Sequence, residues 1–486
     1  MKIDLKWKKA STKNDVQITD EIGKEKVEEN LKGNAIYKTK QKLKNERKST
    51  EFGQIFAKKF AKQKERVSKP EVVQKTKKKR EIREISFLEN AKLRKFFSVF
   101  SKREWLVIFL VLLLVGFGCL MVYSASSYSA GYRYGNEYFF LFKQIFGVVL
   151  GIFAMFFLAF VDYHILKRFK YWILAVSVIL LILVFVPGFG VQSYGANRWV
   201  NILGISIQPS EIAKFALVLF LACYLSEQHD KIKTFKGLIP PLLIAGLLCL
   251  LVIIEPSMSV TMCLGCVTLF MLIVGGMSKK HTIMFSSVAV AAVPLLIIAE
   301  PYRLKRLFAF LDPWASPQGE GFQLIQSLYG LGNGGWFGVG LFQSRQKYLF
   351  LPFAESDFIF SIIGEELGYV GCLCLMTVYF VLIYQLFKIG LNAKDRFGCL
   401  LSCGVAIVIA VQMLLNIAVV TGSIPPTGLP LPFISSGGTS VAVFMAGVGV
   451  ALSVSRQSRK KEKETSNFVT QFWKSKKIFS SRSNLF

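Results

Sequence analysis

The sequence predicts an all-α polytopic membrane protein with ten transmembrane helices, and its composition and charge distribution support this fold class. The chain has 486 residues, of which 52% are hydrophobic, and its mean hydropathy is +0.44. The formal net charge is +29, concentrated at the two ends: +16 over residues 1–104, +6 over 105–455 and +7 over 456–486. A hydrophobic body between two basic tails excludes a single soluble domain, and it favours a membrane over nucleic acid as the partner of the basic residues.

Ten apolar runs are long enough to cross a hydrocarbon core of about 30 Å. They span residues 105–125, 138–161, 169–187, 209–226, 237–254, 257–276, 282–299, 358–387, 397–421 and 434–455. Only Glu255-Pro256 separates the fifth run from the sixth. Because proline interrupts the helical hydrogen-bond ladder, we expect two crossings there.

The distribution of Lys and Arg predicts the orientation of these helices. The connections on one side are rich in Lys and Arg, whereas the short connections on the other side carry Arg133 and Arg198. By the positive-inside rule both basic tails, 1–104 and 456–486, are cytoplasmic. We expect the first tail to be mostly disordered and both tails to attract anionic lipids. Residues 300–357, between helices seven and eight, form a large extracytoplasmic loop, and loops of this length are typically functional.

Asp357 lies at the predicted outer edge of helix eight. A carboxylate that is partly removed from water is a candidate general base, because burial raises its pKa. Asp is also a favoured N-terminal helix cap, and the residues alone favour the cap. Two turns deeper, Glu365 and Glu366 cannot both face lipid, so we expect them to be structural polar residues of the bundle interior.

Glu211 and Lys214 share one face at the start of helix four, which follows Gln208 and begins near Ser210. They form either a local ion pair or a site where Lys214 meets an anionic ligand, and their placement leaves both interpretations open.

The segment 427–440 contains prolines and glycines that predict irregular backbone near membrane depth. Its residues Ser435, Ser436 and Gly437 could offer backbone N–H groups to a phosphate at a helix N-terminus.

The cysteines and histidines predict neither disulfides nor a histidine metal site on the outer side. All nine cysteines lie in apolar stretches. The three histidines, His164, His229 and His281, fall in predicted cytoplasmic loops.

Taken together, these segments resemble the SEDS family (shape, elongation, division and sporulation proteins). The resemblance covers about residues 105–455 and rests on 121–126, 197–199, 208–214, 321–327, 338–341, 356–360 and 429–440. The string Ile363–Gly368 is more similar to the FtsW and SpoVE branches than to RodA. The chain departs from the family pattern at Glu255-Pro256-Ser257, where a Pro-Asp motif is common, and at Ser436, where Tyr is usual.

The resemblance implies a peptidoglycan glycosyltransferase that polymerises lipid II at the outer face of the cytoplasmic membrane. The family's catalytic aspartate matches Asp357, which would accept a proton from the acceptor sugar. Cations would stabilise the departing undecaprenyl diphosphate, and the candidates are Lys214, Arg198, Arg303, Arg306 and Lys347. The family also implies Mg or Mn, which Asp357 and the diphosphate would share.

The partners that the resemblance implies are lipid II and its undecaprenyl diphosphate-linked glycan, a class B penicillin-binding protein (the crosslinking transpeptidase), and divisome proteins. The Gly-Glu-Glu-Leu-Gly string favours septal synthesis during cell division over an elongation or sporulation role. A lipid II flippase is the alternative, although a transporter needs polar groups accessible from both sides. A non-enzymatic scaffold is a third hypothesis, in which Asp357 would be dispensable.

Overall fold

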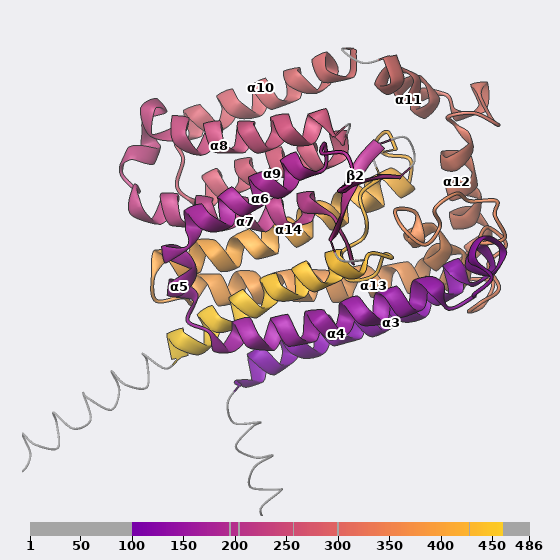
Figure 1. Ribbon diagram of the computed structural model, residues 1–486, viewed down its shortest axis with the longest axis horizontal. Coiled ribbons are helices and arrows are strands. Elements are labelled where there is room, and N and C mark those ends of the chain that lie inside the picture. Colours follow the sequence, from indigo (N-terminus) through magenta and orange to yellow (C-terminus); the bar gives the residue numbers. More distant parts are fainter. Residues whose placement is uncertain are drawn as a thin grey trace, which may run out of the picture. The chain divides into compact units, whose positions relative to one another are not determined.

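The computed structural model describes residues 100–193, 196–202, 205–255, 257–298, 301–426 and 428–459, and these form a bundle of long helices (Figure 1). The predicted disorder of the 1–104 tail falls almost entirely outside the described residues, as does most of the 456–486 tail.

Each of the ten predicted crossings coincides with a helix. The helices are α3 (Lys102–Tyr134), α4 (Phe139–Phe160), α6 (Lys170–Leu183), α7 (Pro209–Glu227), α8 (Phe235–Ile254), α9 (Met258–Val274), α10 (Lys279–Ile298), α13 (Ile359–Leu391), α14 (Arg396–Val420) and Gly438–Arg459. Among the described residues, seven helices are long and apolar enough to cross a membrane: α3, α4, α7, α8, α13, α14 and Gly438–Arg459. Helices α6 and α9 are apolar but shorter. The chain therefore has the helices of a multi-pass membrane protein.

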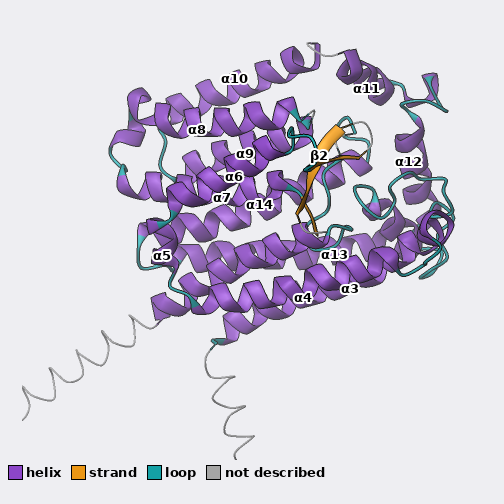
Figure 2. Ribbon diagram, in the orientation of Figure 1, coloured by secondary structure: helices purple, strands orange, loops and turns teal. Residues whose placement is uncertain are grey.

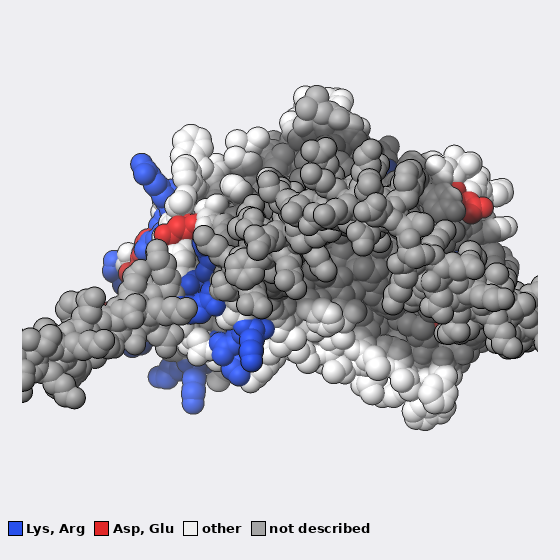
Figure 3. Space-filling view, turned by 90° about the horizontal axis from the view of Figure 1, so that it is seen from below, with Lys and Arg blue, Asp and Glu red and all other residues white. Residues whose placement is uncertain are grey.

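The beginning of α3 and the end of the Gly438–Arg459 helix lie side by side. Ser101 caps α3 by accepting from the N–H of Glu104, whose carboxylate accepts from the N–H of Ser101 in return. Glu104 also accepts a hydrogen bond from Ser455 (2.8 Å) and pairs with Arg459 (3.6 Å). The described bundle therefore begins and ends at the same end. Figure 3 shows Lys and Arg side chains gathered toward one end of the described part.

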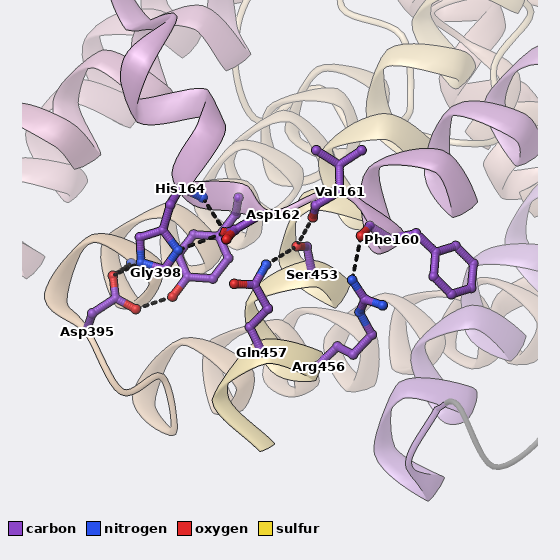
Figure 4. Close-up of polar contacts among 10 residues, drawn as sticks. Phe160, Val161, Asp162, His164, Asp395, Gly398, Ser453, Arg456 and Gln457 are labelled. Carbon is purple, nitrogen blue, oxygen red and sulfur yellow. Dashed lines mark hydrogen bonds and ion pairs between the residues drawn. The ribbon is translucent and has the colours of Figure 1, made fainter. Parts of the chain in front are cut away.

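A polar cluster ties further segments together at the end where α14 begins (Figure 4). Asp395 caps α14 through the N–H of Gly398 (3.0 Å) and accepts a hydrogen bond from the hydroxyl of Tyr163, in the short helix α5 (Tyr163–Arg168). From the Gly438–Arg459 helix, Arg456 donates to the carbonyl of Phe160 at the end of α4. These contacts satisfy backbone groups that the helix ends leave open.

The segment 188–208 contains a three-stranded antiparallel sheet, so the all-α prediction is wrong at this point (Figure 2). The strands are β1 (Gly190–Ser193), β2 (Ala196–Ile202) and β3 (Ile205–Ile207), with Val200 opposite Ile207. Val200 is buried, and β2 contacts α7. Strand pairing satisfies backbone groups that a buried loop would leave without partners.

The segment 300–357, predicted as a long loop, is partly helical. It contains α11 (Pro301–Leu311), the 3₁₀ turn η2 (Pro313–Ala315) and α12 (Phe322–Gly334), and α12 contacts α13. The non-helical stretch 335–358 follows and leads into α13.

A close contact at two glycines positions the Gly438–Arg459 helix. A Cβ atom on Gly147 of α4 would lie 2.2 Å from the Cα and the carbonyl oxygen of Gly438. A larger residue cannot fit there without a backbone shift, so α4 fixes where this helix begins.

We predict that Gly147→Ala lowers the free energy of unfolding by about 1–3 kcal/mol, the usual cost of overpacking. Gly116→Ala in α3 is the matched control, because a Cβ there meets nothing within 4 Å. Thermal unfolding of both variants in detergent measures the difference. Equal unfolding temperatures would contradict the close helix contact.

Candidate functional site

The candidate site is built around a buried, non-helical segment, 428–437, that leads into the Gly438–Arg459 helix. Side chains from the surrounding helices bond its backbone. Gln412 of α14 donates to the Pro430 carbonyl (2.9 Å), and Asn416 of α14 donates to the Leu429 carbonyl (2.7 Å). Tyr379 of α13 donates to the Pro432 carbonyl. The segment therefore has a defined shape without regular secondary structure.

Asp357 lies two residues before α13 and beside this segment. Asn416, which holds Leu429, also donates to the Asp357 carbonyl (2.8 Å). Gly428 faces the carboxylate, because a Cβ on this residue would lie 3.4 Å from Asp357 Oδ2. Its φ of +75° is also one that other residues rarely adopt. Glycine at this position therefore leaves room beside the Asp357 carboxylate.

The two serines before the Gly438–Arg459 helix hold the residues that precede Asp357. The Ser435 hydroxyl donates to the Ser356 carbonyl, and the Ser436 N–H donates to the Glu355 carbonyl (2.8 Å). The phosphate role of Ser435, Ser436 and Gly437 stays a prediction. All three of their backbone N–H groups have protein partners: that of Ser435 donates to the Leu431 carbonyl (3.1 Å), and that of Gly437 donates to the side-chain oxygen of Gln144 (3.1 Å). These residues position the Asp357 segment.

The surroundings of Asp357 raise the pKa of its carboxyl group. The carboxyl is half-buried, and its removal from water raises the pKa of Asp357 to about 7. The nearby Glu355 charge raises this pKa further, whereas the charges of Arg306 and Arg198 lower it. A carboxyl with a pKa near neutrality can both accept and release a proton at physiological pH.

The arginines near Asp357 come from two different segments. Arg306 of α11 donates to the Pro426 carbonyl (3.1 Å) and pairs with Glu320 (3.8 Å). Arg303 lies one turn earlier in α11, so the two can share a face. Arg198 of β2 donates to the Glu255 carbonyl (3.5 Å). The tertiary structure thus brings Arg198 and Arg306 close enough to Asp357 for their charges to act on it, and their substrate-binding role stays a prediction.

Lys214 and Glu211 form an ion pair of 2.8 Å inside the bundle, and both side chains are buried. Lys214 also donates to Gln412, the residue that holds Pro430. Of the two interpretations, the geometry favours the ion pair, because the ammonium is enclosed by protein partners. Ser210 is buried and Gln208 is half-buried at the beginning of α7, so this helix end is enclosed as well.

Lys347, in the stretch before α13, bonds to Glu366. Its ammonium is 3.3 Å from Glu366 Oε1 and 2.7 Å from the Phe342 carbonyl. Ser124 of α3 donates to the same Glu366 oxygen (2.6 Å). Neighbouring Glu365 accepts from the N–H groups of Arg345 and Gln346. Both glutamates are buried and bond to α3 and to the stretch before α13, in keeping with a structural role.

Sequence reasoning missed Gln412, Asn416 and Glu255. Gln412 and Asn416 lie four residues apart in an otherwise apolar helix, so polar residues at helical spacing were the available signal. Glu255 is buried between α8 and α9. Neither of its carboxylate oxygens has a hydrogen-bond partner among the described residues, and the charge of Arg198 acts on the carboxyl. Burial raises the pKa of Glu255 to about 8.

The side chains near Asp357 fit a divalent cation only with help from a phosphate. In the part of the chain that the structure describes, no group of three or more His, Cys, Asp or Glu residues could hold a metal ion. Asp357 and Glu355 are carboxylates near enough for their charges to interact. Since Mg²⁺ is commonly held by one or two carboxylates together with substrate phosphates, this donor set is compatible with such a site.

The helical bundle defines a polytopic membrane protein, with the Asp357 carboxyl just before the long helix α13. The family model FtsW/RodA/SpoVE, described as cell cycle protein, matches residues 104–460. The chain therefore belongs to this family, which is the SEDS family.

Curated relatives align over nearly their whole length. Stage V sporulation protein E of Bacillus subtilis is 39% identical, and the alignment covers 73% of this chain and 98% of the relative. The probable peptidoglycan glycosyltransferase FtsW of Geobacter sp. strain M18 is 37% identical, with 73% of this chain and 97% of the relative covered.

Solved structures show the same fold. A chain of a peptidoglycan synthase complex that coordinates polymerization and crosslinking has a TM-score of 0.62 and 29% identity, covering 73% of this chain and 98% of that chain. The rod shape determining protein RodA of Thermus thermophilus has a TM-score of 0.54 and 26% identity, covering 73% and 97%.

We predict that Lys214→Met lowers the free energy of unfolding by about 3–5 kcal/mol, because it leaves Glu211 as an uncompensated buried charge. The double variant Glu211→Gln/Lys214→Met removes both charges and should recover much of this loss. Thermal unfolding in detergent measures both.

Lys170→Met is the matched control, because Lys170 pairs with Glu227 (2.9 Å) at a more exposed position. It should cost no more than about 1 kcal/mol. Equal losses for Lys214→Met and Lys170→Met would contradict the structural role of the buried pair.

Proposed function

We propose that this chain is a peptidoglycan glycosyltransferase that polymerises lipid II at the outer face of the cytoplasmic membrane during septal synthesis. One observation carries the proposal: a half-buried carboxyl, Asp357, lies near the charges of Arg198 and Arg306 with its pKa near 7. The relatives named peptidoglycan glycosyltransferase support the reaction.

In this reaction ionised Asp357 accepts the proton of the acceptor sugar's 4-hydroxyl as that oxygen attacks the anomeric carbon of the donor. The bond between the anomeric carbon and the diphosphate oxygen breaks, and undecaprenyl diphosphate leaves with the bonding electrons. Arg306 and Arg198, with Arg303 one turn away from Arg306, are the cations placed to attract this anion. A divalent cation held by Asp357 and the diphosphate would supply further positive charge. Asn416 and Ser435 keep the Asp357 segment in place.

The proposed topology has ten crossings with both termini in the cytoplasm, which places Asp357 on the side where lipid II is polymerised. The ten helices that coincide with the predicted crossings support the count. An even number returns the chain to its starting side, and the contacts of Glu104 with Ser455 and Arg459 support this. Asp357, the sheet 190–207 and the segment 300–357 then lie at the outer face.

The proposed partner is a class B penicillin-binding protein that crosslinks the new glycan, with divisome proteins around the pair. The related chain from a peptidoglycan synthase complex supports such a partnership. The basic tails remain candidates for contact with anionic lipids.

We predict that Asp357→Asn abolishes polymerisation, with a fall of at least about 100-fold, because general-base catalysis typically supplies 10²–10⁴-fold. The assay uses purified protein with its penicillin-binding partner, lipid II and a divalent cation, and it separates the glycan products by length. Asp312→Asn is the matched control: Asp312 is an exposed cap of η2, and asparagine caps equally well.

The pH dependence of the wild type tests the same assignment. Because the base acts only when ionised, kcat/KM should rise about tenfold per pH unit below pH 7 and level off above it. A carboxyl with the ordinary pKa of about 3.9 would give a flat profile across this range. Full activity of Asp357→Asn would refute the catalytic role of this residue.

A further inference from the structure

A second feature lies next to the Asp357 segment: a cavity of about 210 Å³ between the last turns of α3 and the stretch that precedes α13. Ser129, Tyr132 and Arg133 of α3 line one side, and Lys347 and Glu355 line the other. Pockets for complete small ligands are typically about 300–1,000 Å³, so this cavity suits one ring of a larger ligand.

The charges around the cavity favour a neutral, hydroxyl-rich group over a phosphate. Arg133 and Glu355 face it with opposite charges, and they interact electrostatically. The ammonium of Lys347 is already bonded to Glu366 and to the Phe342 carbonyl. The remaining polar groups offer both donors and acceptors, and the Glu355 carboxylate would repel an anion.

The apolar part of the lining fits the carbon faces of a sugar ring. Tyr132 lines the cavity and is 76% exposed, so its flat ring is available for contact. Leu351 and Ala354 contribute further apolar surface. A pyranose ring presents hydroxyls at its edge and C–H groups on its faces, so an amphipathic tyrosine beside charged groups complements it.

The cavity is close to Asp357 and rigidly connected to it. Glu355 precedes Asp357 by two residues, which separates their Cα atoms by at most about 7 Å. The backbone between them is fixed, because Ser436 and Ser435 bond to the carbonyls of Glu355 and Ser356. A group held in the cavity would therefore have a defined position relative to the proposed base.

We propose that this cavity is a saccharide subsite that binds one N-acetylhexosamine ring of the lipid-linked substrate. The inference rests on the proposed function and adds to it the place where a sugar is held. The ring belongs either to the incoming lipid II or to the growing strand, and the chemistry of recognition is the same for both.

Two pairs of variants test the proposal in full-length protein with its partner, with lipid II as the probe. Ser129→Leu fills the cavity, and Ser129→Ala is its control without added volume. Arg133→Gln removes a guanidinium that lines the cavity and replaces it with a shorter, uncharged amide. Lys143→Gln is its control, because Lys143 lies on α4, packs over Phe139 and does not line the cavity. Unfolding temperatures identify any variant that fails to fold, in which case the other pair decides.

A subsite for the incoming lipid II predicts a KM for lipid II about tenfold higher in Ser129→Leu and Arg133→Gln, the loss expected for one or two hydrogen bonds. A subsite for the growing strand predicts shorter glycans at unchanged KM. Either result, with both controls at the wild-type level, supports the proposal. Unchanged KM and unchanged glycan length in folded variants would overturn it. Absence of polymer from the wild type would instead refute the proposed function itself.

Discussion

The structure depends on one constraint: the buried backbone between Gly428 and Gly437 is not helical, and its carbonyl groups still need hydrogen-bond donors. Gln412, Asn416 and Tyr379 supply these donors from two surrounding helices. An unsatisfied carbonyl in such surroundings would cost several kcal/mol. Because Asn416 also holds the Asp357 carbonyl, the bonds that stabilise this segment also position the proposed base.

Buried charges in this protein have two kinds of surroundings. Lys214 and Lys347 are enclosed and paired with glutamates, where each balances a charge that the bundle interior would otherwise leave uncompensated. Arg198 and Arg306 instead belong to a strand and a helix outside the long bundle helices, and their charges act on Asp357. The lysines that pair with buried glutamates are therefore different residues from the arginines whose charges act on Asp357.

The helices and the position of the key carboxyl were predictable, whereas its surroundings were not. The lengths of the apolar runs and the break at Glu255-Pro256 predict the helices, because a segment that crosses the bilayer must form its own backbone hydrogen bonds. The sheet 190–207 and the helices α11 and α12 were missed, because their sequences are short and lack a long apolar period. Gln412 and Asn416 were missed as well, since their role depends on a segment that follows them in the chain but folds back onto them.

The sequence alone determined the class of the protein, the helices and the candidate base, because long apolar runs and an ordered set of motifs are local properties. Only the tertiary structure decided which partners each polar residue has. Lys214 and Lys347 were candidates equal to Arg198 and Arg306, and all four are cations in the sequence. The two lysines and the two arginines differ in their surroundings. The lysines are buried in ion pairs with glutamates, whereas folding brings Arg198 of β2 and Arg306 of α11 close enough to Asp357 for their charges to lower its pKa. Coulomb interactions depend on distance in space, and sequence spacing does not provide that distance.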